Sequence, residues 1–119
     1  MTESGVIDPS ALDALTAATG GDPNFLGEMI DVFVADAVEL LDLMDEALAI
    51  GDTEALRRAA HSLKSNAATF GATRLTALTR QLEEQGKSAE LAGSPPYLAA
   101  ARAEFAAVED ALLATRASL

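Results

Sequence analysis

The residues best suited to chemistry in this sequence are a histidine and a lysine three positions apart. His61 is the only histidine among the 119 residues, and Lys64 follows it in the stretch AAHSLKSNAATFG. Imidazole titrates near neutral pH, where its neutral form is a good nitrogen nucleophile. One ring nitrogen could accept a phosphoryl group while a hydrogen bond holds the other, and a nearby ammonium group could stabilise the charge being transferred. The pair therefore indicates phosphoryl transfer.

The sequence contains no motif that would activate a phosphate by itself. A Walker A loop, a kinase glycine-rich loop and an acidic Mg²⁺ cluster near His61 are all missing. We therefore expect a phosphoryl carrier without ATP binding or kinase activity of its own, not an enzyme. We also expect neither cofactor nor metal, because the chain has one His, no Cys and acidic residues spread around its helices.

Charge is unevenly distributed along the chain, whose net charge is −11. Residues 1–56 contain thirteen acidic and no basic side chains, whereas residues 57–87 contain six of the eight Lys and Arg against two acids. Nucleic-acid binding is not expected, since phosphate neutralisation needs a dense basic surface. The one basic region surrounds His61 and predicts a local anionic partner.

The remaining composition favours a cytoplasmic location. With no cysteine, the chain can form no disulfide, which fits a reducing compartment. The N-terminal residues lack a secretory signal, and no apolar run approaches the length of a membrane span. The starting Met and the capped ends favour a free-standing protein.

Turn residues divide the chain into five helical segments and no strand. An Asp-Pro pair starts each of the first two segments, at Asp8 and Asp22, and glycine follows each of them. We expect helices at residues 9–19, 23–50, 53–70, 73–85 with Gly86 beyond, and from the Pro95-Pro96 pair to near Ser118. The stretch KSAELAGSPPY before the last helix reads alternatively as a flexible loop. The fold class is therefore all-α, an antiparallel up-and-down four-helix bundle with a short extra N-terminal helix.

Apolar spacing indicates which faces of these helices form the core. In the second helix, one stripe recurs at steps of three and four residues. Its members are Leu26, Ile30, Phe33, Ala37, Leu40, Met44 and Leu48. The fourth helix should pack through Leu75, Leu78 and Leu82, and the last through Leu98, Phe105, Val108 and Leu112. We therefore expect residues 1–119 to form a single domain, whose core spans about residues 6–115.

A helical wheel predicts that His61 points away from this core. At 100° per residue, the apolar side chains of the third helix lie about 120° to 180° around the axis from His61. These are Leu56, Ala59, Leu63, Ala67 and Phe70. Ser65 and Ala68 on the histidine side are small, so a partner could approach the imidazole closely.

These residues resemble the histidine-containing phosphotransfer (HPt) domain family. The family signature H-x-L-K-G is matched by His61, Leu63 and Lys64, with Ser65 where glycine is usual and Gly71 as the later glycine. The resemblance extends through FLGEMIDVFVADAVELLDLMDEALAIGDTEALRRAAHSLK and covers about residues 6–115. It implies a phosphorelay intermediate of two-component signalling.

The resemblance also implies roles for individual residues. His61 would be phosphorylated on Nε2, Lys64 would stabilise the phosphoryl group, and Glu83 stands where the family often has a glutamine that orients the imidazole. The exposed face of the third helix around His61 separately provides the candidate partner-binding residues, which are Arg57, Arg58, Lys64, Ser65 and Ala68. The partners would be response-regulator receiver domains, which bring the Mg²⁺, and a hybrid histidine kinase. We expect a monomer.

Other interpretations use the same residues. An HPt-fold adaptor could bind or sequester a receiver or a histidine kinase without being phosphorylated, although the intact pair of His61 and Lys64 argues against it. A dimerisation helix of a kinase would carry an acidic residue directly after the histidine, where this chain has Ser62. For docking, an apolar patch from the first helix beside the histidine would fit, formed by Ile7, Leu12 or Leu15.

Overall fold

The computed structural model describes residues 6–119. Within this range the chain is helical, with no strand. The elements are α1 (Pro9–Ala18), α2 (Pro23–Ile50), α3 (Thr53–Thr69), α4 (Thr73–Ser88), the short 3₁₀ helix η2 (Leu91–Gly93) and α5 (Ser94–Ala117). These bounds confirm the predicted all-α class.

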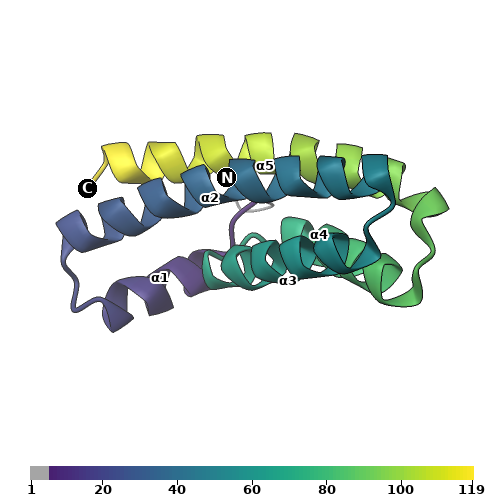
Figure 1. Cartoon of the computed structure of the whole chain (residues 1–119). Helices are drawn as coiled ribbons and strands as arrows, with labels where there is room; N and C mark the ends of the chain where they lie inside the picture. The colour runs from purple at the N-terminus through teal and green to yellow at the C-terminus, as the bar shows by residue number, and fades with distance from the viewer. Residues whose placement is uncertain (1–5) are drawn as a thin grey trace.

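The four long helices form a closed antiparallel bundle. Consecutive long helices pack against each other, and α5 returns to pack along α2. Figure 1 shows α2 and α5 as one layer over α3 and α4, with α1 extending the lower layer beyond the end of α3. The predicted up-and-down bundle with a short extra N-terminal helix is confirmed.

Aspartate caps fix the beginnings of α1, α2 and α3. The side chain of Asp8 accepts a hydrogen bond from the Ser10 amide, and Asp22 and Asp52 cap α2 and α3 in the same way. A carboxylate at this position satisfies amides that have no partner within the helix. Gly51 ends α2 with φ of 73°, a left-handed conformation that glycine adopts without strain.

Two expectations about the second half of the chain are wrong. Gly86 does not follow α4 but lies within it, since the helix continues to Ser88. A Cβ atom on Gly86 would lie 2.8 Å from the Arg57 amide nitrogen, so glycine here lets α3 and α4 approach closely. The alternative of a flexible two-proline loop is also wrong, because Pro95 and Pro96 lie in the first turn of α5, where proline is tolerated.

The buried stripe of α2 differs from the predicted one in its second half. Leu41 and Ala47 are buried, whereas Leu40 and Leu48 are only partly buried. A straight helix drifts by about 20° per heptad relative to a strict seven-residue repeat. The buried row of α2 therefore advances by four residues after Ala37, to Leu41, where the predicted row advances by three. In α4, Leu78 is also only partly buried, while the predicted inward residues of α5 are all buried.

An aromatic cluster closes the core next to the end of α3. Phe33 stacks on Phe70 with ring centroids 4.7 Å apart, and Phe105 meets Phe33 edge-on at 6.2 Å. Offset-stacked and edge-on pairs of this kind add to the stability gained from burial. The cluster ties α2, the C-cap of α3 and α5 together and so fixes the orientation of α3.

Candidate functional site

His61 lies on the outer face of α3, as the helical wheel predicts. Its side chain is 57% exposed, whereas the opposite face of the same helix is buried through Leu56, Ala59, Leu63 and Ala67. The core therefore fixes the rotation of α3 about its axis, and this rotation presents the imidazole to solvent.

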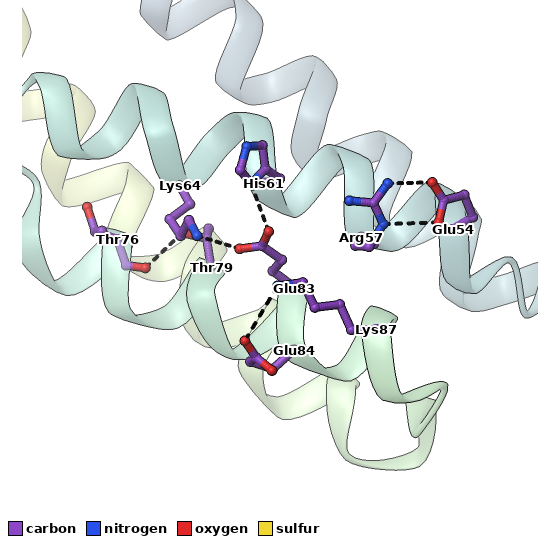
Figure 2. Close-up of polar contacts among 9 residues, drawn as sticks. All are labelled: Glu54, Arg57, His61, Lys64, Thr76, Thr79, Glu83, Glu84 and Lys87. Carbon is purple, nitrogen blue, oxygen red and sulfur yellow. Dashed lines mark hydrogen bonds and ion pairs between the residues drawn. The ribbon is translucent and has the colours of Figure 1, made fainter.

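Glu83 joins the two residues that the sequence singled out. One carboxylate oxygen, Oε2, lies 2.7 Å from Nδ1 of His61, and the other, Oε1, lies 2.6 Å from Nζ of Lys64. Figure 2 shows the carboxylate of α4 rising between the two α3 side chains. Glu83 is itself almost fully buried, at 3% exposure. A single buried carboxylate thus holds both side chains.

The hydrogen bond to Glu83 determines which nitrogen of His61 carries the proton. An ionised carboxylate can only accept hydrogen bonds, so Nδ1 must be the donor. In the neutral imidazole, Nε2 is then unprotonated and keeps its lone pair. The nucleophilic nitrogen is therefore the one directed away from Glu83.

Glu83 stays ionised because cations compensate for its burial. The hydrogen bond from Lys64 lowers the pKa of the Glu83 carboxyl most strongly, burial raises it, and the bond with His61 lowers it further. The balance is a pKa below the ordinary value. The carboxylate is thus charged at neutral pH and available as an acceptor for the imidazole.

Close packing of α4 on α3 brings Glu83 to this position. Gly86, one turn further along α4, lies against the backbone of Arg57. One turn before Glu83, Thr79 is fully buried, and its hydroxyl donates to the backbone oxygens of Leu75 and Thr76 at 2.8 and 3.0 Å. Small or internally bonded residues on both sides of Glu83 therefore allow the carboxylate to reach α3.

The basic region around His61 is largely paired with carboxylates. Arg57 forms a two-pronged contact with Glu54, one turn earlier on α3, and Arg58 lies 3.7 Å from the same carboxylate. The hydrogen bond with Glu54 raises the pKa of Arg57. Because two guanidinium groups share one carboxylate, this end of the site keeps an excess of positive charge. Ser65 and Ala68 are exposed beside His61.

The surface next to His61 on its other side comes from α2. A hollow of about 450 Å³ is lined by His61, Ser62 and Ser65 of α3 together with Asp36, Glu39 and Leu40 of α2. The sequence analysis did not identify the α2 residues as part of the site. Asp36 and Glu39 lie outside the predicted stripe of α2, but only the packing of α2 against α3 brings them next to His61.

The expectation that the first helix supplies an apolar patch beside His61 is wrong for two of its residues. Ile7 is buried, and Ile7 and Leu12 line a separate hollow against α5. Leu15 is partly buried against the core. α1 packs at the end of the bundle, and the hollow that contains His61 is lined by residues of α2 and α3 instead.

Residues 6–119 contain neither a candidate metal cluster nor a candidate membrane span. No three His, Asp or Glu side chains in this range converge to hold an ion. None of the helices described there combines the length and apolar character that crossing a bilayer requires.

Comparison with known proteins gives three consistent matches. The family model described as "Hpt domain" matches residues 28–114. The crystal structure of histidine-containing phosphotransfer protein B (HptB) from Pseudomonas aeruginosa PAO1 superimposes with a TM-score of 0.87 at 31% identity, covering 95% of this chain and 96% of that one. The sensor protein TorS of Escherichia coli (strain K12) is 42% identical over 64 residues, which are 54% of this chain but only 7% of TorS.

Proposed function

The chain belongs to the Hpt domain family, and on this premise we propose that it carries phosphoryl groups between proteins of two-component signalling on His61. The observation that supports this most directly is the contact between Nδ1 of His61 and the buried carboxylate of Glu83. This contact leaves Nε2 as the nucleophile on an exposed side chain. The proposed donors and acceptors are receiver domains, with a hybrid histidine kinase upstream.

In the proposed transfer, the donor is an aspartyl phosphate on a receiver domain. Nε2 of His61 attacks phosphorus in line with the departing oxygen, the P–O bond to the aspartate breaks, and the aspartate leaves as a carboxylate. The Nδ1 proton stays on the ring, which becomes a phosphorylated imidazolium paired with Glu83. The reverse step onto a second receiver restores the neutral imidazole, so no net proton is exchanged with solvent.

Lys64 supplies positive charge next to the group in transit. Its ammonium lies 2.6 Å from Glu83, and its side chain is 26% exposed, so it can also approach the phosphoryl oxygens. The ammonium thus has two anionic partners, the carboxylate and the phosphoryl group. Electrostatic stabilisation of this type acts on the charge that develops in the transition state. Mg²⁺ would be supplied by the receiver.

Transfer from a phosphorylated receiver tests the proposed function. The wild-type protein and a His61→Gln variant are each mixed with Mg²⁺ and with prephosphorylated receiver domains from the same organism. We expect acid-labile, base-stable label on the wild type and none on the variant, with circular dichroism showing that both are folded. Receivers that bind the wild type without labelling it would refute the carrier function and leave the adaptor.

A further inference from the structure

The acceptor nitrogen of His61 lies next to two carboxylates that have no cationic partner. Glu83 holds Nδ1 from the α4 side of α3, whereas the hollow that His61 lines is on the α2 side and is bordered by Asp36 and Glu39. Nε2, which is directed away from Glu83, is therefore on the side of the ring nearer to this hollow. Asp36 and Glu39 are exposed, and neither forms an ion pair with any residue in 6–119.

Other aspartates of α2 differ from these two carboxylates because they are paired. Asp31 is bonded to Arg116, and Asp42 is bonded to Arg102. These contacts hold α5 against α2 and place a guanidinium group beside each carboxylate. The two carboxylates next to His61 have no such neighbour, so they keep their negative charge in a chain whose net charge is already −11.

The cations of α3 do not compensate this charge. Nζ of Lys64 lies 2.6 Å from Oε1 of Glu83, on the α4 side of the helix. The two arginines before the histidine, Arg57 and Arg58, both contact Glu54. None of these three cations lines the hollow that contains the histidine. The hollow is therefore bordered by negative charge and by neutral side chains.

The backbone around His61 offers no site for an anion. His61 lies in the middle of α3 (Thr53–Thr69), so the neighbouring amides donate to carbonyl groups of the same helix. Helix N-termini bind phosphate because their first amides have no partner within the helix, and no helix N-terminus lines this hollow. A free phosphoryl compound that approaches Nε2 thus meets two carboxylates and no backbone donor.

We propose that Asp36 and Glu39 exclude small anionic phosphodonors from His61 and so restrict the carrier to phosphoryl groups that a protein delivers together with Mg²⁺. This inference rests on the proposed function and concerns the specificity for the donor. Repulsion from the two carboxylates raises the free energy of a free donor near Nε2 in proportion to the charge of that donor. A phosphoryl group whose charge is balanced by a metal ion is repelled less.

The disfavoured reaction is attack of Nε2 on a free phosphoryl compound. With phosphoramidate, Nε2 attacks phosphorus, the P–N bond breaks, and the protonated nitrogen of the donor leaves as ammonia. With acetyl phosphate, the P–O bond breaks and acetate leaves. In both reactions the ring keeps its Nδ1 proton and becomes a phosphorylated imidazolium, so the charges balance without any further reactant.

Labelling by these two donors tests the inference without a partner protein. Near pH 7, phosphoramidate is a monoanion and acetyl phosphate is a dianion. In an Asp36→Asn/Glu39→Gln variant at low salt, the second-order rate constant for labelling His61 should rise about two- to threefold with phosphoramidate and about five- to tenfold with acetyl phosphate. The gain with the dianion is about the square of the gain with the monoanion, because the Coulomb energy is proportional to the charge of the donor.

A matched variant and a change of salt separate local repulsion from the effect of net charge. Asp13→Asn/Asp110→Asn changes the net charge by the same amount at exposed positions outside the hollow, and it should keep the wild-type rate constants. Added salt should speed labelling of the wild type more than that of Asp36→Asn/Glu39→Gln, because ions screen the repulsion that the two carboxylates cause.

The outcomes distinguish this inference from the proposed function. Wild-type rate constants in Asp36→Asn/Glu39→Gln, equal gains in the matched variant, or equal gains with the two donors would overturn the exclusion while leaving His61 as the carrier. Absence of label on His61 from both small donors and from phosphorylated receivers would instead refute the proposed function.

Discussion

Replacing Glu83 with glutamine removes the charge of this side chain while keeping its shape. The amide has one acceptor and one donor end, but the carboxylate accepts from Nδ1 of His61 at one oxygen and from Nζ of Lys64 at the other. If the amide oxygen faces Lys64, the amide nitrogen faces the imidazole and favours a proton on Nε2. That tautomer has no lone pair for attack.

The size of this effect follows from the strength of the lost bond. A hydrogen bond to a charged group contributes about 1.5–3 kcal/mol and a neutral one about 1 kcal/mol, so the preference for the Nδ1 proton weakens by about 1–1.5 kcal/mol. This difference is about a tenfold change in the population of the reactive tautomer. Because the ring is 57% exposed and can turn, the variant should keep activity, with phosphoryl transfer about tenfold slower.

Two measurements on the Glu83→Gln variant check this reasoning. Nitrogen-15 chemical shifts of the imidazole report the tautomer, and rapid-quench kinetics report transfer from a phosphorylated receiver. Glu84→Gln is the matched control, since Glu84 is exposed on the same helix and lies 3.9 Å from Lys87. Wild-type tautomer populations and rates in Glu83→Gln, or equal losses in both variants, would refute the proposed orienting function of Glu83.

Three further predictions concern the same contacts between α3 and α4. Because the pKa of Glu83 is lowered in the folded state, its contribution to stability is present above its unfolded pKa of about 4.3 and is lost as pH falls through the folded value. In urea unfolding, the free energy of unfolding should therefore fall less on acidification in Glu83→Gln than in the wild type. Lys64→Gln should slow transfer from a receiver by about 10- to 100-fold in rapid-quench assays, and a wild-type rate would exclude charge stabilisation by Lys64. Gly86→Ala should lower the free energy of unfolding by about 1–2 kcal/mol, since its Cβ would lie 2.8 Å from the Arg57 amide nitrogen. Gly93→Ala should change the free energy of unfolding very little, because the nearest atom to its Cβ would be Nε2 of Gln85 at 3.5 Å.

Local signals in the sequence were sufficient for the helices and for the direction of His61. The Asp-Pro pairs at Asp8 and Asp22 and the glycine at Gly51 act through contacts within a few residues, so the predicted ends of α1 and α2 agree with the structure. The exposure of His61 follows from helical periodicity alone, because the apolar face of α3 has only one way to reach the core.

Features that depend on contacts between helices could not be read in the same way. Gly86 looks like a helix terminator in the sequence, but the backbone of Arg57 determines its place inside α4. The resemblance suggested Glu83 as a partner of His61, yet its near-complete burial and its second contact with Lys64 require the distance between two helices. Asp36 joins the site only through the packing of α2 on α3.

The nitrogen that carries the phosphoryl group tests the central claim most directly. Protein labelled with nitrogen-15 in its histidine is phosphorylated and examined by phosphorus-31 and nitrogen-15 NMR, in which the one-bond coupling identifies the bonded atom. We predict a bond to Nε2 of His61, with the proton retained on Nδ1 beside Glu83. A phosphoryl group on Nδ1, or on a residue other than His61, would contradict the proposed geometry of transfer.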